Sequence, residues 1–184
     1  MAKILTVFRL IVSPQSMWSR IFSNSSSGTT ELTVYYPLVG LLAVSSFLKL
    51  VYDPLATLHA VLIGAVVSFV AFFLGYIVAS FVISMLLPKI QEQGKVTSDG
   101  RVRTFVMYNM SILVLIEIVK NFLPVDMPLI YIFLLYILYV ISKSVKFFSI
   151  GHDKNMIFVC GAFCVIVFMP AVFSLVLNKL MPAV

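Results

Sequence analysis

Long uninterrupted apolar runs dominate the chain, and polar residues gather in the short segments between them. A helix needs about 20 apolar residues to cross a hydrocarbon core of roughly 30 Å. Runs that meet or approach this length cover residues 32–52, 55–87, 104–123, 127–142 and 156–180. None shows the alternation typical of strands in a membrane β-barrel. The pattern therefore predicts five transmembrane helices, of which the second is longer than one crossing needs and the fourth is the shortest.

Two prolines mark predicted helix ends, and a third falls inside a predicted helix. Pro54 separates the first run from the second, and Pro88 follows the second run. Pro170 lies within the fifth run, where its missing amide hydrogen removes the bond to the carbonyl of Ile166. The sequence therefore predicts a kink in the fifth helix near that residue.

The segment before the first run follows a different pattern. Its apolar residues share one face of a short helix, namely Ile4, Leu5, Phe8, Ile11 and Val12. Lys3 and Arg9 lie off that face, which is typical of an amphipathic helix lying on a membrane surface. Pro14 predicts the start of a second short helix. We therefore divide the chain into an interfacial segment, residues 1–31, and a transmembrane domain, residues 32–184.

Composition agrees with this reading. The chain has 184 residues, enough for one domain, and 61% of them are hydrophobic while 11% are charged. A soluble domain carries roughly 25% charged residues. Because so few charges cannot cover a water-facing surface, we exclude a soluble enzyme or a nucleic-acid-binding module and expect an all-α integral membrane protein.

The basic residues are distributed unevenly between the two sides of the predicted helices. One side carries Lys3, Arg9, Arg20, Lys89, Lys95, Arg101, Arg103, Lys143, Lys146 and Lys154. The other side carries Lys49, Lys120 and Lys179. Lysine and arginine in short loops favour the cytoplasmic side. The pattern predicts a cytoplasmic N-terminus and an outer C-terminus.

Several residues of the basic side are candidates for contact with anionic lipid headgroups or a partner protein. They are Trp18, Arg20, Lys89, Lys95, Arg101 and Arg103. Tryptophan favours the headgroup level of a bilayer, and each basic group near anionic lipid contributes about 1 kcal/mol of binding. We therefore expect the net charge of +6 to attract lipid headgroups and not nucleic acid.

Glu117 is the one ionisable residue well inside a predicted span, and Lys120 follows on the same helical face. Asn109 lies about two turns before Glu117 on the same helix. An intramembrane carboxylate is costly and marks a candidate functional site, here a proton or cation relay. The alternative is a Glu117–Lys120 pair that extends toward the membrane surface and holds the helix in place.

Small residues in the second run predict close packing against another helix. They are Gly64, Ser68, Gly75 and Ala79. Cys160 and Cys164 are one turn apart in the fifth run, and we expect both to act as small apolar residues.

No catalytic or cofactor site is expected. His59 and His152 fall on opposite sides of the membrane, so they cannot form one metal or haem site. The sequence also lacks a paired-histidine protease motif, a nucleophile elbow and a glycine-rich phosphate loop. We therefore predict a protein that is not an enzyme.

Three short segments carry a resemblance to a known family. They are the segment with Pro14, Trp18 and Ile21, the run Tyr36-Pro37-Leu38-Val39-Gly40-Leu41, and the run Phe73-Leu74-Gly75-Tyr76. Together with five spans and a cytoplasmic N-terminus, these segments resemble the bacterial branch of the Yip family, five-pass proteins first described as interactors of Ypt/Rab GTPases. The resemblance implies a bacterial inner-membrane protein that organises or adapts other membrane components.

Two functions remain open at this point. The first is the organising or adaptor role, with membrane lipids and membrane or cytoplasmic proteins as partners. The second is a small oligomeric transporter or channel that uses Glu117. Whether the chain forms a homo-oligomer is also open.

Overall fold

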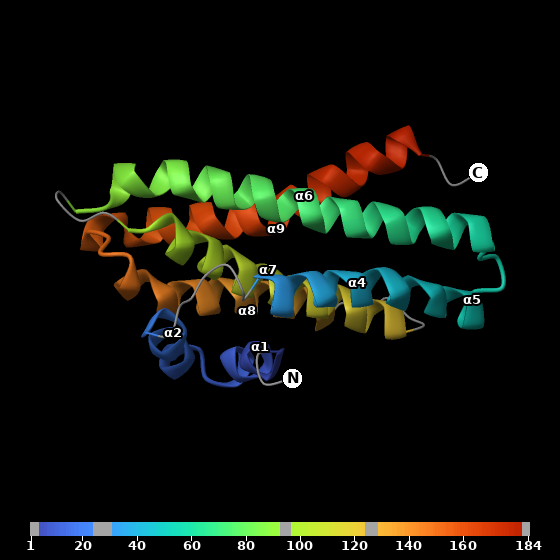
Figure 1. The fold of residues 1–184 in the computed structure, drawn as a ribbon, viewed down its shortest axis with the longest axis horizontal. Helices are drawn as coiled ribbons and strands as arrows, with labels where there is room; N and C mark the ends of the chain where they lie inside the picture. The colour runs from blue at the N-terminus through green and yellow to red at the C-terminus, as the bar shows by residue number, and fades with distance from the viewer. Residues whose placement is uncertain (1–3, 24–30, 93–96, 124–128, 182–184) are drawn as a thin grey trace.

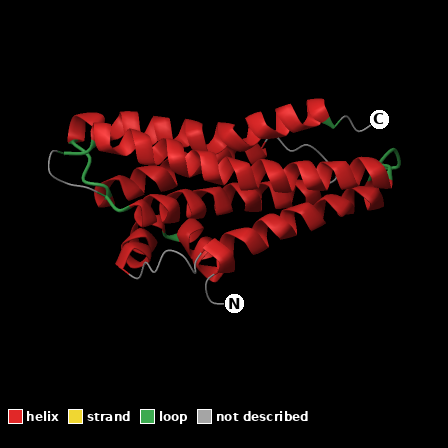
Figure 2. Ribbon diagram, turned by 45° about the horizontal axis from the view of Figure 1, so that its top comes forward, coloured by secondary structure: helices red, strands yellow, loops and turns green. Residues whose placement is uncertain are grey.

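The structure, a computed structural model, describes residues 4–23, 31–92, 97–123 and 129–181. Within these residues almost all of the backbone is helical and no strand forms (Figure 2). The helical segments that are long and apolar enough to cross a membrane are Thr33–Tyr52, Leu58–Ile90, Asp99–Phe122 and His152–Leu180. The predicted all-helical membrane class is thus confirmed, with four segments of spanning length.

The fourth predicted run forms a shorter helix. α8 covers Leu129–Ser144, and its 16 residues extend about 24 Å at 1.5 Å per residue. That length falls short of a hydrocarbon core of roughly 30 Å. A 3-10 turn, η3 (Val145–Phe147), continues it. In Figure 1, α8 runs back along the bundle beside α7.

The first long segment is assembled from four helical pieces. A π-helix, η1 (Glu31–Tyr35), leads into α4 (Tyr36–Ser45), a 3-10 turn, η2 (Ser46–Leu48), and α5 (Lys49–Tyr52). Pro37 explains the first change, because it has no amide hydrogen for a regular helical bond and the turn before it widens. The hydroxyls of Ser45 and Ser46 both donate to the carbonyl of Leu42, which accompanies the second change.

The next two helices differ from their predicted bounds for local reasons. α6 covers Leu58–Ile90 and begins where the Thr57 hydroxyl oxygen accepts the amide of Ala60 at 3.2 Å. It continues past Pro88, so the expectation that the helix ends before this proline is wrong. α7 covers Asp99–Phe122 and thus includes a polar first turn that lies outside the predicted apolar run.

The last helix passes through its proline. A short turn, η4 (His152–Lys154), precedes α9 (Asn155–Leu180), and Pro170 is buried within α9. Figure 1 shows the second half of α9 rising away from the direction of its first half, as the missing bond at Pro170 predicts. α9 packs mainly against α6.

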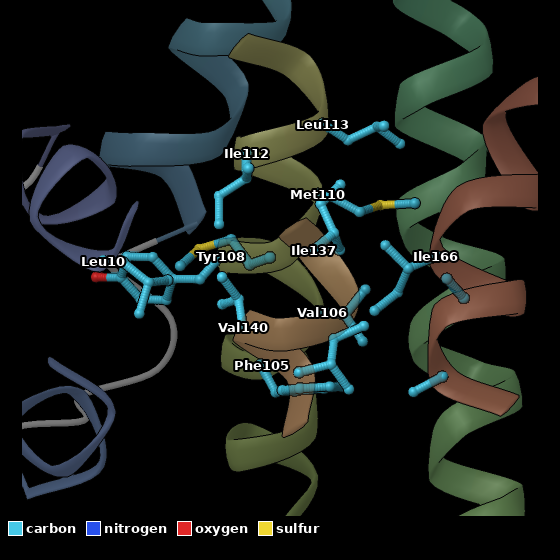
Figure 3. Packing of buried hydrophobic residues seen from close by; sticks show 14 of the residues in the cluster. Leu10, Phe105, Val106, Tyr108, Met110, Ile112, Leu113, Ile137, Val140 and Ile166 are labelled. Carbon is cyan, nitrogen blue, oxygen red and sulfur yellow. The ribbon is translucent and has the colours of Figure 1, made fainter. Parts of the chain in front are cut away.

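α7 forms the centre of the bundle. Of its apolar window, 78% is buried, against 28% for α9. Its side chains extend toward helices on opposite sides of it: Tyr108 extends toward Leu10 of α1 (Ile4–Val12), and Met110 extends in the direction of Ile166 of α9 (Figure 3). α7 is surrounded by α4, α6, α8 and α9.

Two short helices lie against the side of the bundle, out of line with the long helices (Figure 1). α1 covers Ile4–Val12 and contacts α7, and α2 covers Pro14–Ser23 and contacts α8. The start of α2 at Pro14 is as predicted. The predicted apolar face of α1 is not the one that packs on the protein: Val7 and Leu10 are buried, whereas Leu5, Phe8 and Val12 are exposed. α1 therefore turns Leu5, Phe8 and Val12 outward, whereas Ile11 of the same predicted face packs against the core.

Candidate functional site

Two loops that are distant in sequence meet at one end of the bundle. An antiparallel backbone bridge joins Gln91, after α6, to Ile150, after α8. The amide of Glu92 donates to the carbonyl of Ser149 at 3.1 Å. Ser149 adopts a left-handed backbone with φ of 51°, which is unfavourable for residues other than glycine. The Gln91–Ile150 bridge and the hydrogen bond from Glu92 to Ser149 hold this turn in place.

We call this end of the molecule the basic end. The end of α6, the starts of α7 and α9 and the end of α8 all lie there (Figure 1). Its exposed cations are Arg20, Lys89, Arg101, Arg103, Lys146 and Lys154. The Nζ atom of Lys154 donates to the backbone carbonyl of Lys89 at 3.3 Å, so the ammonium group that precedes α9 lies against the end of α6. Lys95 falls outside the described residues.

The expectation for Trp18 is wrong. Its side chain is completely buried, and its Nε1 atom donates to the carbonyl of Val140 at 3.0 Å. Its ring stacks on Phe22 and lies 5.8 Å from the ring of Phe105, centroid to centroid. Trp18 therefore anchors α2 to α8 and α7 and is not available to lipid headgroups. Arg20, by contrast, is exposed as predicted.

A groove opens between α6 and α7 near the basic end. It has a volume of about 470 Å³ and is lined by Tyr36, Tyr76, Ile77, Ser80, Phe81, Ser84, Met85, Asp99 and Arg103. Sequence reasoning identified Arg103 but missed Ser80, Ser84 and Asp99. The spacing of the two serines, four residues apart within an apolar helix, is the signal that could have found them.

Glu117 and Lys120 form the predicted ion pair at the opposite end of the bundle, which we call the far end. The Nζ atom of Lys120 lies 3.1 Å from Oε1 and 3.0 Å from Oε2 of Glu117. Both side chains are about one-third exposed. The geometry is that of the anchoring pair.

Glu117 also lines a polar groove at the far end, with a volume of about 480 Å³. The groove collects polar side chains from α5, the residue after it, α7 and α9 that the sequence analysis did not treat as site candidates: Lys49, Asp53, Asn121, Ser174 and Asn178. The Nδ2 atom of Asn121 donates to the hydroxyl of Ser45 at 2.9 Å. Phe72 lies in its wall.

Asn109 does not join this groove. It is completely buried, and its Nδ2 atom donates to the carbonyl of Phe105, one turn earlier in α7, at 2.9 Å. Its Oδ1 atom has no hydrogen-bond partner among the described residues. The structure therefore does not bring Asn109 and Glu117 to one cavity.

The predicted packing stripe on α6 is divided into two parts. Gly75 packs tightly against α9, because a Cβ atom there would lie 3.0 Å from Cγ of Pro170. Ala79 is completely buried. Gly64 has open space around it, so its predicted role in close packing is wrong, and both Gly64 and Ser68 line the far groove.

The remaining candidates stay apart. Cys160 and Cys164 are free and exposed on α9. Both histidines are exposed, and His59 lies at the far end of α6, whereas His152 lies at the basic end. Over the ranges that the structure describes, no three histidine, cysteine or acidic side chains gather.

Comparison with known proteins found no similar protein. No family model matches the chain, and neither a curated protein nor a solved structure matches it.

Proposed function

We propose that the chain is a non-enzymatic, multi-pass membrane protein that organises or adapts other membrane components through its basic end. The observation that carries this proposal is the joining of two basic loops by the Gln91–Ile150 bridge. The bridge builds one charged surface from separate parts of the chain. A rigid charged surface at the end of a membrane bundle fits contact with anionic lipid or with an acidic protein segment.

The proposal includes five membrane spans, with α8 as the fourth along the chain. Several α8 side chains support this placement because they are apolar and exposed: Ile132, Phe133 and Leu135. With η3 added, the helical path from Leu129 to Phe147 lengthens toward a crossing. A 16-residue helix can also cross where the bilayer thins locally or the flanking lysines extend to the surface.

We further propose that the basic end faces the cytoplasm, because cationic loops are retained there. The N-terminus is then cytoplasmic and the C-terminus is outside, as in the bacterial branch of the Yip family that the sequence resembles. The outward apolar face of α1 would lie in the inner leaflet, where a surface helix buries such residues.

A charge-reversal experiment tests this function. The full chain is reconstituted in discs of mixed neutral and anionic lipid, and copurifying proteins and retained lipids are identified by mass spectrometry. We expect the double variant Lys146→Glu, Lys154→Glu to lose a stoichiometric partner and its enrichment of anionic lipid. Lys179→Glu, at the far end, is the matched control and should lose neither. Identical profiles for the native chain and the double variant would refute the proposal.

A transporter or channel is the second candidate, and the far groove is the observation that favours it. Glu117 lies there with Asn121 and Asn178, and intramembrane carboxylates in cavities often carry protons or cations. The burial of Asn109 elsewhere makes this candidate the weaker one.

Flux measurements separate the two candidates. Proton and potassium flux are measured in liposomes with the native chain, with Glu117→Gln and with Asp153→Asn, a carboxylate at the other end of the molecule. A flux that only Glu117→Gln abolishes would establish transport. The organising function predicts no flux above that of empty liposomes in any sample.

A further inference from the structure

The groove between α6 and α7 has one apolar and one polar side. On α6, Ile77, Phe81 and Met85 are exposed, so this side continues onto the apolar surface of the bundle. Ser80 and Ser84, on the same helix, line the groove itself. A ligand that enters sideways from the membrane would thus meet apolar side chains along its tail and hydroxyls at its head.

Two opposite charges line the other wall. Asp99 and Arg103 are one turn apart in the first two turns of α7, and both are exposed. In the described parts of the chain, neither forms an ion pair with the other or with a third residue. The groove therefore presents one free carboxylate and one free guanidinium side by side.

The hydrogen-bonding groups of the groove are incompletely satisfied. Ser80 is 8% exposed, and its hydroxyl has no hydrogen-bond partner among the described residues. A buried hydroxyl without a partner costs free energy, so such a group indicates a missing ligand. Pro88 lacks an amide hydrogen, so it cannot donate to the carbonyl of Ser84 as the residue of that position normally does.

From these observations we propose that the α6–α7 groove binds the headgroup of a phosphatidylethanolamine molecule. The phosphate contacts Arg103 and the Ser80 hydroxyl near the positive N-terminal end of α7, and the ammonium contacts Asp99. The acyl chains lie along Ile77 and Phe81. The volume of about 470 Å³ is in the range of roughly 300–1,000 Å³ that ligand sites occupy.

The pairing of charges selects this headgroup. Phosphatidylglycerol carries the phosphate but no cation, so it would leave Asp99 facing a like charge. Phosphatidylcholine carries a quaternary ammonium, which has no hydrogen to donate to a carboxylate. Only a phosphate joined to a primary ammonium satisfies both Asp99 and Arg103. This proposal rests on the proposed function only in assuming that the chain lies in a bilayer. Phosphatidylethanolamine is a separate ligand, distinct from the anionic lipid that the basic end is proposed to contact.

Competition between lipids tests the site. The delipidated full chain in detergent receives equal amounts of dioleoyl phosphatidylethanolamine, phosphatidylglycerol and phosphatidylcholine, and native mass spectrometry measures which one is retained. We expect the native chain to retain phosphatidylethanolamine about tenfold better than the others, since a charge-assisted contact is worth about that factor. Asp99→Asn should reverse the preference toward phosphatidylglycerol. Arg103→Gln should lower retention of phosphatidylethanolamine about tenfold, because the variant loses its contact with the phosphate.

Matched variants keep the result interpretable. Asp153→Asn removes a carboxylate at the same end outside the groove, and Lys179→Gln removes a cation at the far end. Both should keep the native preference. Ser80→Ala should weaken phosphatidylethanolamine retention about threefold. The shift in thermal unfolding temperature on adding each lipid checks binding in variants that extract poorly.

Two outcomes would overturn the proposal. Equal retention of the three lipids by the native chain would show that the groove does not select a headgroup. An unchanged preference in Asp99→Asn would show that the carboxylate does not bind the ammonium. Because this experiment uses isolated lipids and leaves Lys146 and Lys154 intact, its failure is distinguishable from loss of the partner surface. The reverse also holds, since charge reversal at those lysines leaves the groove unchanged.

Discussion

α7 and α9 are both long enough to cross a membrane, but they occupy opposite environments. α7 is the less apolar of the two and is mostly buried, whereas α9 is the more apolar and is mostly exposed. Buried polar side chains of α7 bond within their own helix: Ser111 donates to the carbonyl of Met107 and Thr104 to that of Gly100. In lipid the outside of a bundle is as apolar as its core, so hydropathy does not drive a helix inward. Packing and internal hydrogen bonds determine which helix takes the centre.

The largest expected effect comes from deleting an aromatic ring at the centre. Phe105 of α7 is completely buried and contacts the rings of Trp18, Phe148 and Phe158. Phe105→Ala should lower the free energy of unfolding by about 3 kcal/mol, because a cavity remains in the bundle. The measurement is reversible unfolding by dodecyl sulfate in mixed micelles.

Phe168→Ala on α9 is the matched control, since that ring is 57% exposed. Lipid or detergent fills the space, so we expect a change below about 0.5 kcal/mol. Equal losses from the two variants would contradict the contrast between the central and the outer helix.

A smaller effect is expected where α6 and α9 touch. Gly75→Ala places a methyl group 3.0 Å from Cγ and 3.2 Å from the backbone nitrogen of Pro170, and proline backbone cannot easily move aside. We expect a loss of about 1–2 kcal/mol from overpacking. Gly64→Ala, which meets open space in the same helix, should be neutral or slightly stabilising. If both variants unfold alike in the same assay, α9 does not depend on this contact.

Replacing the buried side-chain amide of Asn109 in α7 should raise the free energy of unfolding, whereas Phe105→Ala and Gly75→Ala lower it. Asn109→Leu removes an oxygen that has no hydrogen-bond partner among the described residues, while its volume changes little. We expect the free energy of unfolding to rise by up to about 1 kcal/mol. A loss of stability would show that a bound water or another polar group pairs with that oxygen in the protein.

The smallest effect is expected at the rim of the far groove. Glu117 and Lys120 are each about one-third exposed, and such pairs contribute roughly 0–1 kcal/mol. A double-mutant cycle with Glu117→Gln and Lys120→Gln should give a coupling below about 0.5 kcal/mol. A coupling of several kcal/mol would indicate that the groove excludes water around the pair.

The apolar runs were sufficient to predict the helices but not their neighbours. Pro170 was recognised as a kink, yet nothing in the sequence indicates that Gly75, far away in the chain, lies against it. The average behaviour of tryptophan predicts Trp18 at the membrane surface, but its hydrogen bond to Val140 and its ring contacts within the bundle override that tendency. Such long-range contacts depend on tertiary packing, which local pattern does not encode.

In the candidate sites, too, features within one helix could be predicted and contacts between helices could not. The Glu117–Lys120 pair follows from helical spacing, so it could be predicted. The α6–α7 groove could not, because Ser80 and Asp99 belong to different helices and only the fold sets them on facing walls. The joining of two basic loops at Gln91 and Ile150 is likewise a product of the fold.

The contact between Gly75 and Pro170 also has a consequence for biosynthesis. The ribosome makes Gly75 well before Pro170, and at 5–20 residues per second the interval is roughly 5–20 seconds. During that time α6 is in the membrane without the helix that it packs against most. We expect the insertion machinery, or another helix with small residues, to shield that face of α6 until α9 emerges from the ribosome.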